Sequence, residues 1–158
     1  MFGIDDHALR AHDRLWRDHA DRMLRYATFL VGPDDASDVA VEAFLAAVRT
    51  LTVGSHTNEG SFLIGAVRNR AIDLERSRRR RWRRDLAAVG PRSADAPDTF
   101  ADVRAAVARL SIAQRSVVFL TYWEDRTERD IADILSISPS TVHRHLERAR
   151  AQLGKALQ

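Results

Sequence analysis

Polar residues that can hydrogen-bond to nucleic acid gather in the last stretch of the chain, residues 127–157. Hydroxyl, imidazole and guanidinium groups recur there at helical spacing, and such groups bond to base edges and to phosphate oxygens. Arg144 and Arg148 lie four residues apart and could each pair with guanine or with phosphate. The side chains that we expect to face DNA are Ser140, Thr141, His143, Arg144 and Arg148.

Two short helices joined by a turn would position these side chains. Small Ala132 and branched Val142 stand where the helices of a DNA-reading helix-turn-helix touch, and Ser136 takes the turn position that is usually glycine. Side chains that can cap a helix stand before both helices. They are Thr127 with Asp130 for the first helix and Ser138 followed by Pro139 for the second.

A second polar series precedes this motif at spacings of four, three and four residues, as expected for one face of a helix. Its first member, Asn69, offers both a donor and an acceptor to a base edge. The helix then becomes strongly basic from Arg76 to Arg84, with Trp82 inside the run. A solvated basic tail is the alternative, but the shared face favours nucleic acid. The series is Asn69, Asp73, Arg76 and Arg80.

An acidic face is expected on an earlier helix, where Asp38 and Glu42 lie four residues apart. Like charges at this spacing mildly destabilise an isolated helix. From the pattern alone, a solvated surface is favoured over a docking surface for a basic partner. Histidines His7, His12 and His19 have no clear metal-ligand spacing, so we expect no metal site.

The composition narrows the class of protein. The chain has 158 residues, a net charge of +3 and no cysteine, which excludes disulfides and thiolate metal sites. It shows no apolar run long enough to cross a membrane and no signal-peptide pattern, so we expect a cytoplasmic protein without membrane insertion.

Apolar periodicity predicts an all-α fold, since no alternating stretch of useful length occurs. The expected parts are a helical domain at 12–84, a flexible linker at 85–98 and a helix-turn-helix domain at 99–158. The linker contains Gly90-Pro91 and Pro97 and has no apolar period. Helices are expected at 14–31, 34–51, from 61 to about 84, and from 99, 111, 127 and 138, with a loop at 52–60.

These parts, in this order, resemble a bacterial group 4 (extracytoplasmic function) RNA polymerase sigma factor of the sigma-70 family. The resemblance covers about residues 12–84 and 100–157. In the first half it rests on Asp35-Ala36-Ser37-Asp38-Val39 with Glu42 and Phe44, on Phe62-Leu63 through Arg68-Asn69, and on Ile72-Asp73. In the second half it rests on Leu110 to Arg115, Tyr122 to Asp125, Ile131-Ala132, Thr141-Val142 and Arg148 to Arg150.

The resemblance implies a role for each face. Asp38 and Glu42 would dock on the β′ clamp helices of core RNA polymerase, which makes docking the favoured interpretation of the acidic face. The face of Asn69 would hold the opened −10 element, and a flipped base would lie between the 52–60 loop and the start of the next helix. The helix-turn-helix would read the −35 element. The apolar surface around 110–122 would receive the β flap, and an anti-sigma factor is an expected partner.

Five positions depart from the family pattern. Ser111 replaces a frequent proline, Phe62 a usual tryptophan and Ser136 a glycine. His143 and His145 replace more usual lysine, arginine or serine, which leaves the promoter preference open and suggests pH-sensitive binding.

The expected function is therefore a promoter-specificity subunit without catalysis of its own and without a cofactor. One alternative is an ordinary helix-turn-helix regulator, which would leave the acidic helix and the Asn69 helix unexplained. Another is a degenerate sigma-like interaction protein. An enzyme is disfavoured because no phosphate loop, nucleophile elbow or metal-ligand motif is present.

Overall fold

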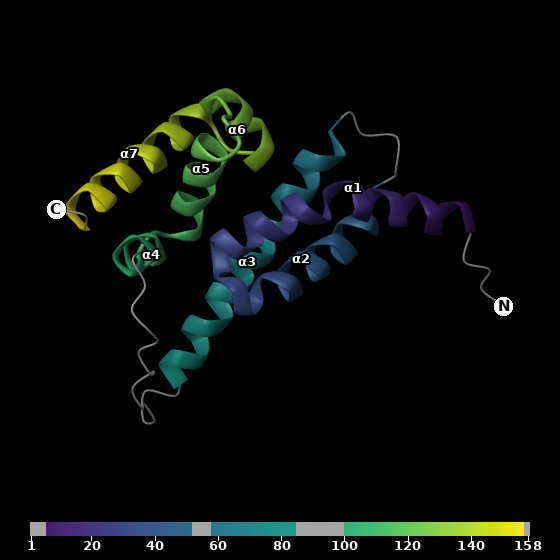
Figure 1. Cartoon of the computed structure of the whole chain (residues 1–158), viewed down its shortest axis with the longest axis horizontal. Helices are drawn as coiled ribbons and strands as arrows, with labels where there is room; N and C mark the ends of the chain where they lie inside the picture. The colour runs from purple at the N-terminus through teal and green to yellow at the C-terminus, as the bar shows by residue number, and fades with distance from the viewer. Residues whose placement is uncertain (1–5, 52–57, 85–99, 157–158) are drawn as a thin grey trace.

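The computed structural model describes residues 6–51, 58–84 and 100–156, and every regular element in those ranges is a helix (Figure 1). The all-α prediction is confirmed. No described helix is both long enough and apolar enough to cross a bilayer. The helices are α1 (Asp6–Val31), α2 (Pro33–Val48), α3 (Glu59–Arg84), α4 (Ala101–Ala108), α5 (Ile112–Tyr122), α6 (Glu128–Leu135) and α7 (Pro139–Ala156).

The first three helices form an N-terminal bundle around large apolar side chains (Figure 1). Met23 and Leu30 of α1 and Leu63 and Val67 of α3 are fully buried there, as their helical spacing predicts. The ring of Trp16 meets that of Phe44 edge to face, with centroids 5.0 Å apart. Burial of these side chains holds α1, α2 and α3 together as one platform.

The last four helices form a C-terminal group in which α5 and α6 pack on α7 and α4 packs on the far end of α7. Val117 and Leu120 of α5, Ile131 of α6 and Val142 of α7 are fully buried. Ala132 is 3% exposed and Val142 is 0% exposed, so both are buried where α6 packs on α7, as predicted.

The two groups of helices share one apolar core, which the sequence did not predict. Helices α1 and α3 contact α5, and α3 also contacts α6. Tyr26 of α1 packs on Phe119 of α5 with ring centroids 5.2 Å apart, and Phe29 packs on the same ring. The C-terminal group therefore lies directly on the N-terminal bundle rather than apart from it (Figure 1).

Several helix ends differ from the predictions. Helix α1 begins at Asp6, eight residues before the expected start. Helix α2 begins at Pro33 after Gly32, which has a φ of 87°, so Asp34 and Asp35 lie inside the first turn and neither caps the helix. It ends at Val48 rather than near Leu51. Proline at the first helical position needs no N–H, and glycine accepts the positive φ before it.

The start of α3 also differs from the expectation. Ser61 lies within the helix, and its N–H donates to Asn58 Oδ1 at 3.1 Å, so Asn58 acts as the cap. The predicted start of α4 at Thr99 and most of the predicted 52–60 loop lie outside the described residues. Phe100 precedes α4 and makes no side-chain cap hydrogen bond.

The caps of the last three helices agree with the sequence. Ser111 and Gln114 form a reciprocal capping box at α5, and Thr127 and Asp130 form one at α6. Ser138 Oγ accepts from the N–H of Thr141 at 3.2 Å, at the start of α7. Ser111 therefore begins α5 by a hydrogen bond where the family often has proline.

Candidate nucleic-acid interface

The second helix of the helix-turn-helix, α7, presents the predicted reading residues to solvent. Ser140, His143, Arg144 and Arg148 are exposed and Thr141 is half-buried. Among the described residues, neither Arg144 nor Arg148 takes part in an ion pair. Two uncompensated cations one turn apart suit two phosphates, or one phosphate and one guanine.

The other three reading residues are tied to neighbours. Ser138 Oγ lies 3.0 Å from Ser140 Oγ and 2.8 Å from Thr141 Oγ1. His143 Nδ1 lies 3.1 Å from Glu128 Oε1 of α6. These contacts hold the first turn of α7 in one geometry before any ligand binds.

Ser136 forms the turn of the motif in the left-handed region, with φ 53° and ψ 47°. The N–H of Ile137 donates to Ala132 O at 3.0 Å, which closes the end of α6. A side chain in this region is strained by contact between Cβ and the carbonyl oxygen. The position usually held by glycine thus has the glycine conformation, although serine occupies it.

His145 does not lie on the exposed face with His143. It is half-buried, and burial lowers its pKa below the usual 6.5, with further lowering by Arg144, Arg68 and Arg148. Arg68 belongs to α3, so His145 faces the N-terminal bundle. His143 is therefore the more exposed of the two histidines and lies with the arginines, while the effect of either histidine on DNA reading stays a prediction.

The face of α3 predicted to hold the −10 element is also exposed. Asn69, Asp73, Arg76 and Arg80 are all accessible to solvent. Asn69 and Asp73 line a cavity of about 680 Å³ with Phe62, which is 42% exposed. An amide and an aromatic ring beside one cavity can bind and stack a base.

The opposite wall of this cavity belongs to α6 and the residues beside it. Arg126, Asp130, Asp133 and Ser136 contribute to it. The backbone oxygen of Ile134 would lie 3.4 Å from a Cβ placed on Gly65 of α3. The start of the helix-turn-helix therefore forms one wall of the cavity beside Asn69 and Asp73, an arrangement that no sequence pattern indicated.

The predicted docking face on α2 is exposed, with Asp38 and Glu42 both at the surface. Glu42 pairs with Arg70 of α3, whereas Asp38 has no ion pair among the described residues. Asp35, one turn earlier, pairs with Arg78 at 2.6 Å. Asp38 is therefore an uncompensated charge on this face.

The apolar stretch 110–122, which was expected to receive the β flap, is mostly buried. Leu110, Val118 and Leu120 are at most 4% exposed, because they form the core of the C-terminal group. An apolar groove of about 340 Å³ lies beside them instead. It is lined by Phe29, Val103, Val107, Val118, Tyr122, Trp123, Arg150 and Leu153.

Two arginine contacts that sequence reasoning missed join the halves of the molecule. Arg22 of α1 binds Glu124 through two hydrogen bonds, Nε to Oε1 at 2.7 Å and Nη2 to Oε2 at 2.6 Å. The side chains are only 22% and 13% exposed. Nothing local marks Arg22 as the partner of a residue so distant in the chain.

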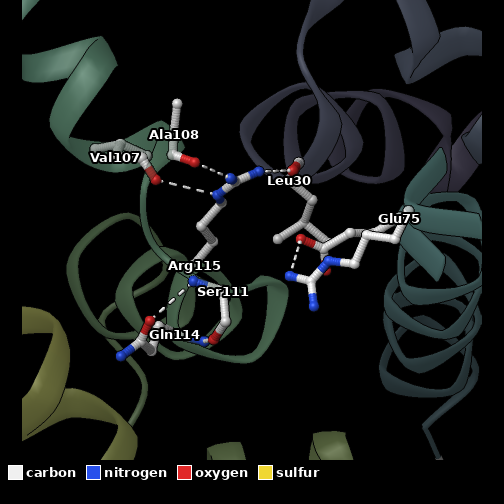
Figure 2. Close-up of polar contacts among 8 residues, drawn as sticks. Leu30, Glu75, Val107, Ala108, Ser111, Gln114 and Arg115 are labelled. Atoms are coloured by element: carbon white, nitrogen blue, oxygen red, sulfur yellow. Dashed lines mark hydrogen bonds and ion pairs between the residues drawn. The ribbon is translucent and has the colours of Figure 1, made fainter. Parts of the chain in front are cut away.

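Arg115 of α5 makes the second link (Figure 2). Its guanidinium donates to Val107 O at 3.1 Å, to Ala108 O at 2.5 Å and to Leu30 O. These oxygens end α4 and α1, where the helix dipoles favour a cation. Burial lowers the pKa of Arg115, and Glu75 opposes that shift.

Comparison with known proteins agrees with this architecture. The family model for sigma-70 region 2 matches residues 15–84, and the model for sigma-70 region 4 matches residues 100–153. The two matches leave only residues 85–99 between them. The chain belongs to the sigma-70 family, in its extracytoplasmic function group.

Solved structures of two sigma-like chains have a similar fold. The sigma factor RpoE in complex with the anti-sigma factor NepR, from Bartonella quintana, gives a TM-score of 0.68 at 21% identity, covering 92% of this chain and 95% of that chain. CnrH in complex with the cytosolic domain of CnrY gives 0.63 at 25% identity, covering 94% and 88%. No curated protein sequence matches the chain.

Proposed function

We propose that this sigma-70 family protein is a promoter-specificity subunit that binds core RNA polymerase and reads two promoter elements. The observation that carries the proposal is the presence of two exposed polar faces on one chain, that of Asn69 on α3 and that of Arg144 on α7. An ordinary helix-turn-helix regulator needs only the second face. The proposal leaves chemistry to the polymerase, as in the rest of the family.

Each face has a proposed target. Asn69, Asp73, Arg76 and Arg80 hold the −10 element, with the base bonded at Asn69 and phosphates at the arginines. The α7 face reads the −35 element as duplex through the major groove. Asp38 and Glu42 dock on the β′ clamp helices, and the apolar groove beside α4 and α5 takes the β flap.

An anti-sigma factor is a further proposed partner. Both similar solved structures named above are complexes of a sigma-like chain with another protein, and the RpoE partner is an anti-sigma factor. The similarity spans nearly all of each chain, which supports a shared surface for such a partner.

Reconstituted transcription tests the proposal. The protein is mixed with core RNA polymerase and genomic promoter fragments, and we expect discrete run-off transcripts that depend on it. Duplex binding without a polymerase complex would support an ordinary helix-turn-helix regulator instead. A stable polymerase complex that yields no transcript from any fragment would support a sigma-like interaction protein.

Two variants separate the two elements. Arg144→Ala should weaken binding at the −35 element by about 1–3 kcal/mol while leaving polymerase affinity unchanged. Asn69→Ala should reduce strand opening, measured by permanganate reactivity at −10, more than it reduces closed-complex binding. Unchanged permanganate reactivity would refute the role of Asn69.

A further inference from the structure

His143, on the exposed face of α7, is bonded across the helix-turn-helix to α6. Its Nδ1 lies 3.1 Å from Oε1 of Glu128, which is the first residue of α6. The side chains of His143 and Glu128 are 60% and 43% exposed. Pairs as exposed as this one contribute little to stability, so the contact acts on the position and chemistry of the ring rather than on the fold.

The contact determines which ring nitrogen of His143 carries a proton. An ionised carboxylate only accepts hydrogen bonds, so the bond to Glu128 requires a proton on Nδ1. A neutral imidazole has a single N–H, which leaves Nε2 without a proton. Within the described residues Nε2 of His143 makes no hydrogen bond, so it is the nitrogen that remains available to DNA.

Nε2 of His143 therefore has two forms with opposite hydrogen-bonding chemistry. When the ring is neutral, Nε2 is an acceptor, which suits the amino groups that adenine and cytosine present in the major groove. When the ring takes up a second proton, Nε2–H is a donor, which suits O6 and N7 of guanine. An imidazole makes this change between about pH 5 and 8.

The charged groups around His143 leave Glu128 as its partner from another helix. Helices α4, α5 and α6 pack on α7, but α4 meets the far end of α7. The one charged residue of α5, Arg115, binds backbone oxygens of α1 and α4 instead. On α7 itself, Arg144 adjoins His143, and Glu147 lies one turn later, where it pairs with its own arginine.

We propose that Glu128 sets the base preference of His143 at the −35 element and makes that preference depend on pH. This inference rests on the proposed function. Glu128 is a positioning residue, since it acts through the ring of His143 rather than on DNA. At the contacted position guanine is preferred at low pH, and adenine or cytosine at high pH. Promoters that differ at this one base pair are then bound in different proportions as the pH changes.

Nitrogen NMR tests the tautomer without DNA or polymerase. The chain has six histidines, and the variant His143→Gln assigns the ring signals of His143 in protein labelled with nitrogen-15 in histidine. At about pH 8 we expect a protonated Nδ1 and an unprotonated Nε2. In Glu128→Gln the amide both donates and accepts, so the Nε2–H form should appear. An Nε2–H ring in the unaltered protein at this pH overturns the proposal.

A selection of promoter sequences tests the reading itself. A duplex library randomised at the −35 element is enriched by the full chain, alone and with core polymerase, at about pH 6 and about pH 8. At one position the ratio of guanine to adenine plus cytosine should fall by about fivefold or more from the lower to the higher pH. The ratios at the other positions serve as the internal reference.

Two variants and a matched control connect the change to the pair. Glu128→Gln should keep guanine at the higher pH, because its neutral ring can carry the proton on Nε2. His143→Lys only donates, so it should prefer guanine equally at both pH values. The control His145→Gln removes the half-buried histidine of the same helix and should retain the full pH response. A purely structural contact would weaken Glu128→Gln on all sequences and leave the base ratios unchanged.

The outcomes separate this inference from the proposed function. Base ratios that do not change with pH, or that change equally in Glu128→Gln, overturn the role of Glu128. Enrichment of a −35 sequence by the protein alone, with no polymerase complex and no transcript, overturns the proposed function, while the pH response of that sequence still decides the role of the pair. Failure to enrich any sequence, with or without polymerase, overturns both.

Discussion

Two serines in the turn of the helix-turn-helix have opposite effects on the stability of the fold. Ser136 pays conformational strain in the left-handed region, whereas Ser138 stabilises α7 by accepting a backbone hydrogen bond. The two serines are chemically identical and lie in the same turn. Their effects on stability differ because Ser136 has a strained backbone conformation, whereas Ser138 accepts a hydrogen bond from an N–H that would otherwise be unsatisfied.

Replacing Ser136 by glycine should therefore stabilise the protein. Relief of left-handed strain, less the entropy of a freer unfolded chain, gives about 0.5–1 kcal/mol. Chemical denaturation measures the free energy of unfolding. Ser138→Ala serves as the opposite case and should cost about 1 kcal/mol. A loss of stability in Ser136→Gly would show that the serine side chain contributes more than its strain costs.

His145 should make stability depend on pH. Burial lowers the pKa of His145 in the folded state, so the unfolded chain takes up a proton first as the pH falls through about 6.5. Stability is therefore complete above this pH and decreases toward the lower folded pKa. His145→Gln should flatten the dependence in denaturation curves between pH 7.5 and 5.5. Replacing exposed His143 by Gln is the control and should leave the dependence in place.

Helices α2 and α3 pack side by side, and each has a buried apolar face and an exposed polar face. Glu42 pairs with Arg70 and Asp35 with Arg78, so salt bridges join the exposed edges of the two helices. Exposed pairs of this kind contribute little stability, typically under 1 kcal/mol. Their effect is to orient the helices, while Asp38 remains without a compensating cation among the described residues.

Asp38→Arg should weaken the affinity for core polymerase by about tenfold or more, because it reverses the charge that faces the proposed basic partner. Titration of labelled protein with core polymerase measures the change. The control Asp18→Arg makes the same charge change at an exposed position of α1, and this variant should bind core polymerase like the unaltered protein. Equal affinities of the two variants would place the docking face elsewhere.

The two groups of helices are held together in an arrangement that places α6 across the cavity beside Asn69. The Arg22–Glu124 pair, the Arg115 contacts and the aromatic cluster around Phe119 all cross between them. Helix α6 lines the opposite wall of the cavity beside Asn69, so it limits the room for a promoter strand there. Under the proposed function we therefore expect the two groups to separate when DNA and polymerase bind, as a population shift.

Arg22→Ala should favour the separated state. It leaves Glu124 largely buried without its bidentate partner, at a cost on the order of 1–3 kcal/mol. Small-angle X-ray scattering should show a larger radius of gyration than that of the unaltered protein. Arg25→Ala, which removes an exposed arginine paired with Asp21 on the same helix, should not change it. An unchanged radius for Arg22→Ala would mean that the aromatic contacts suffice for closure.

The amino-acid sequence by itself determined the helices, the capping boxes of α5 and α6, the turn at Ser136 and the polar faces of α3 and α7. These features depend on periodicity and on hydrogen bonds between residues a few positions apart, which the order of residues states directly. The starts of α2 at Pro33 and of α3 at Glu59 were mispredicted because several neighbouring residues could serve equally well as caps. The start of α1 at Asp6 was missed because its first residues are polar and show no apolar period.

Only the tertiary structure decided how the two halves meet. Arg22 and Glu124 are 102 positions apart, and nothing near either residue selects the other. Local sequence also does not indicate that Arg115 of α5 binds the end of α1, that His145 is half-buried, or that α6 lines the cavity beside Asn69. Such contacts arise when apolar surfaces of separate helices pack, and packing is set by the shape of the whole core rather than by local spacing.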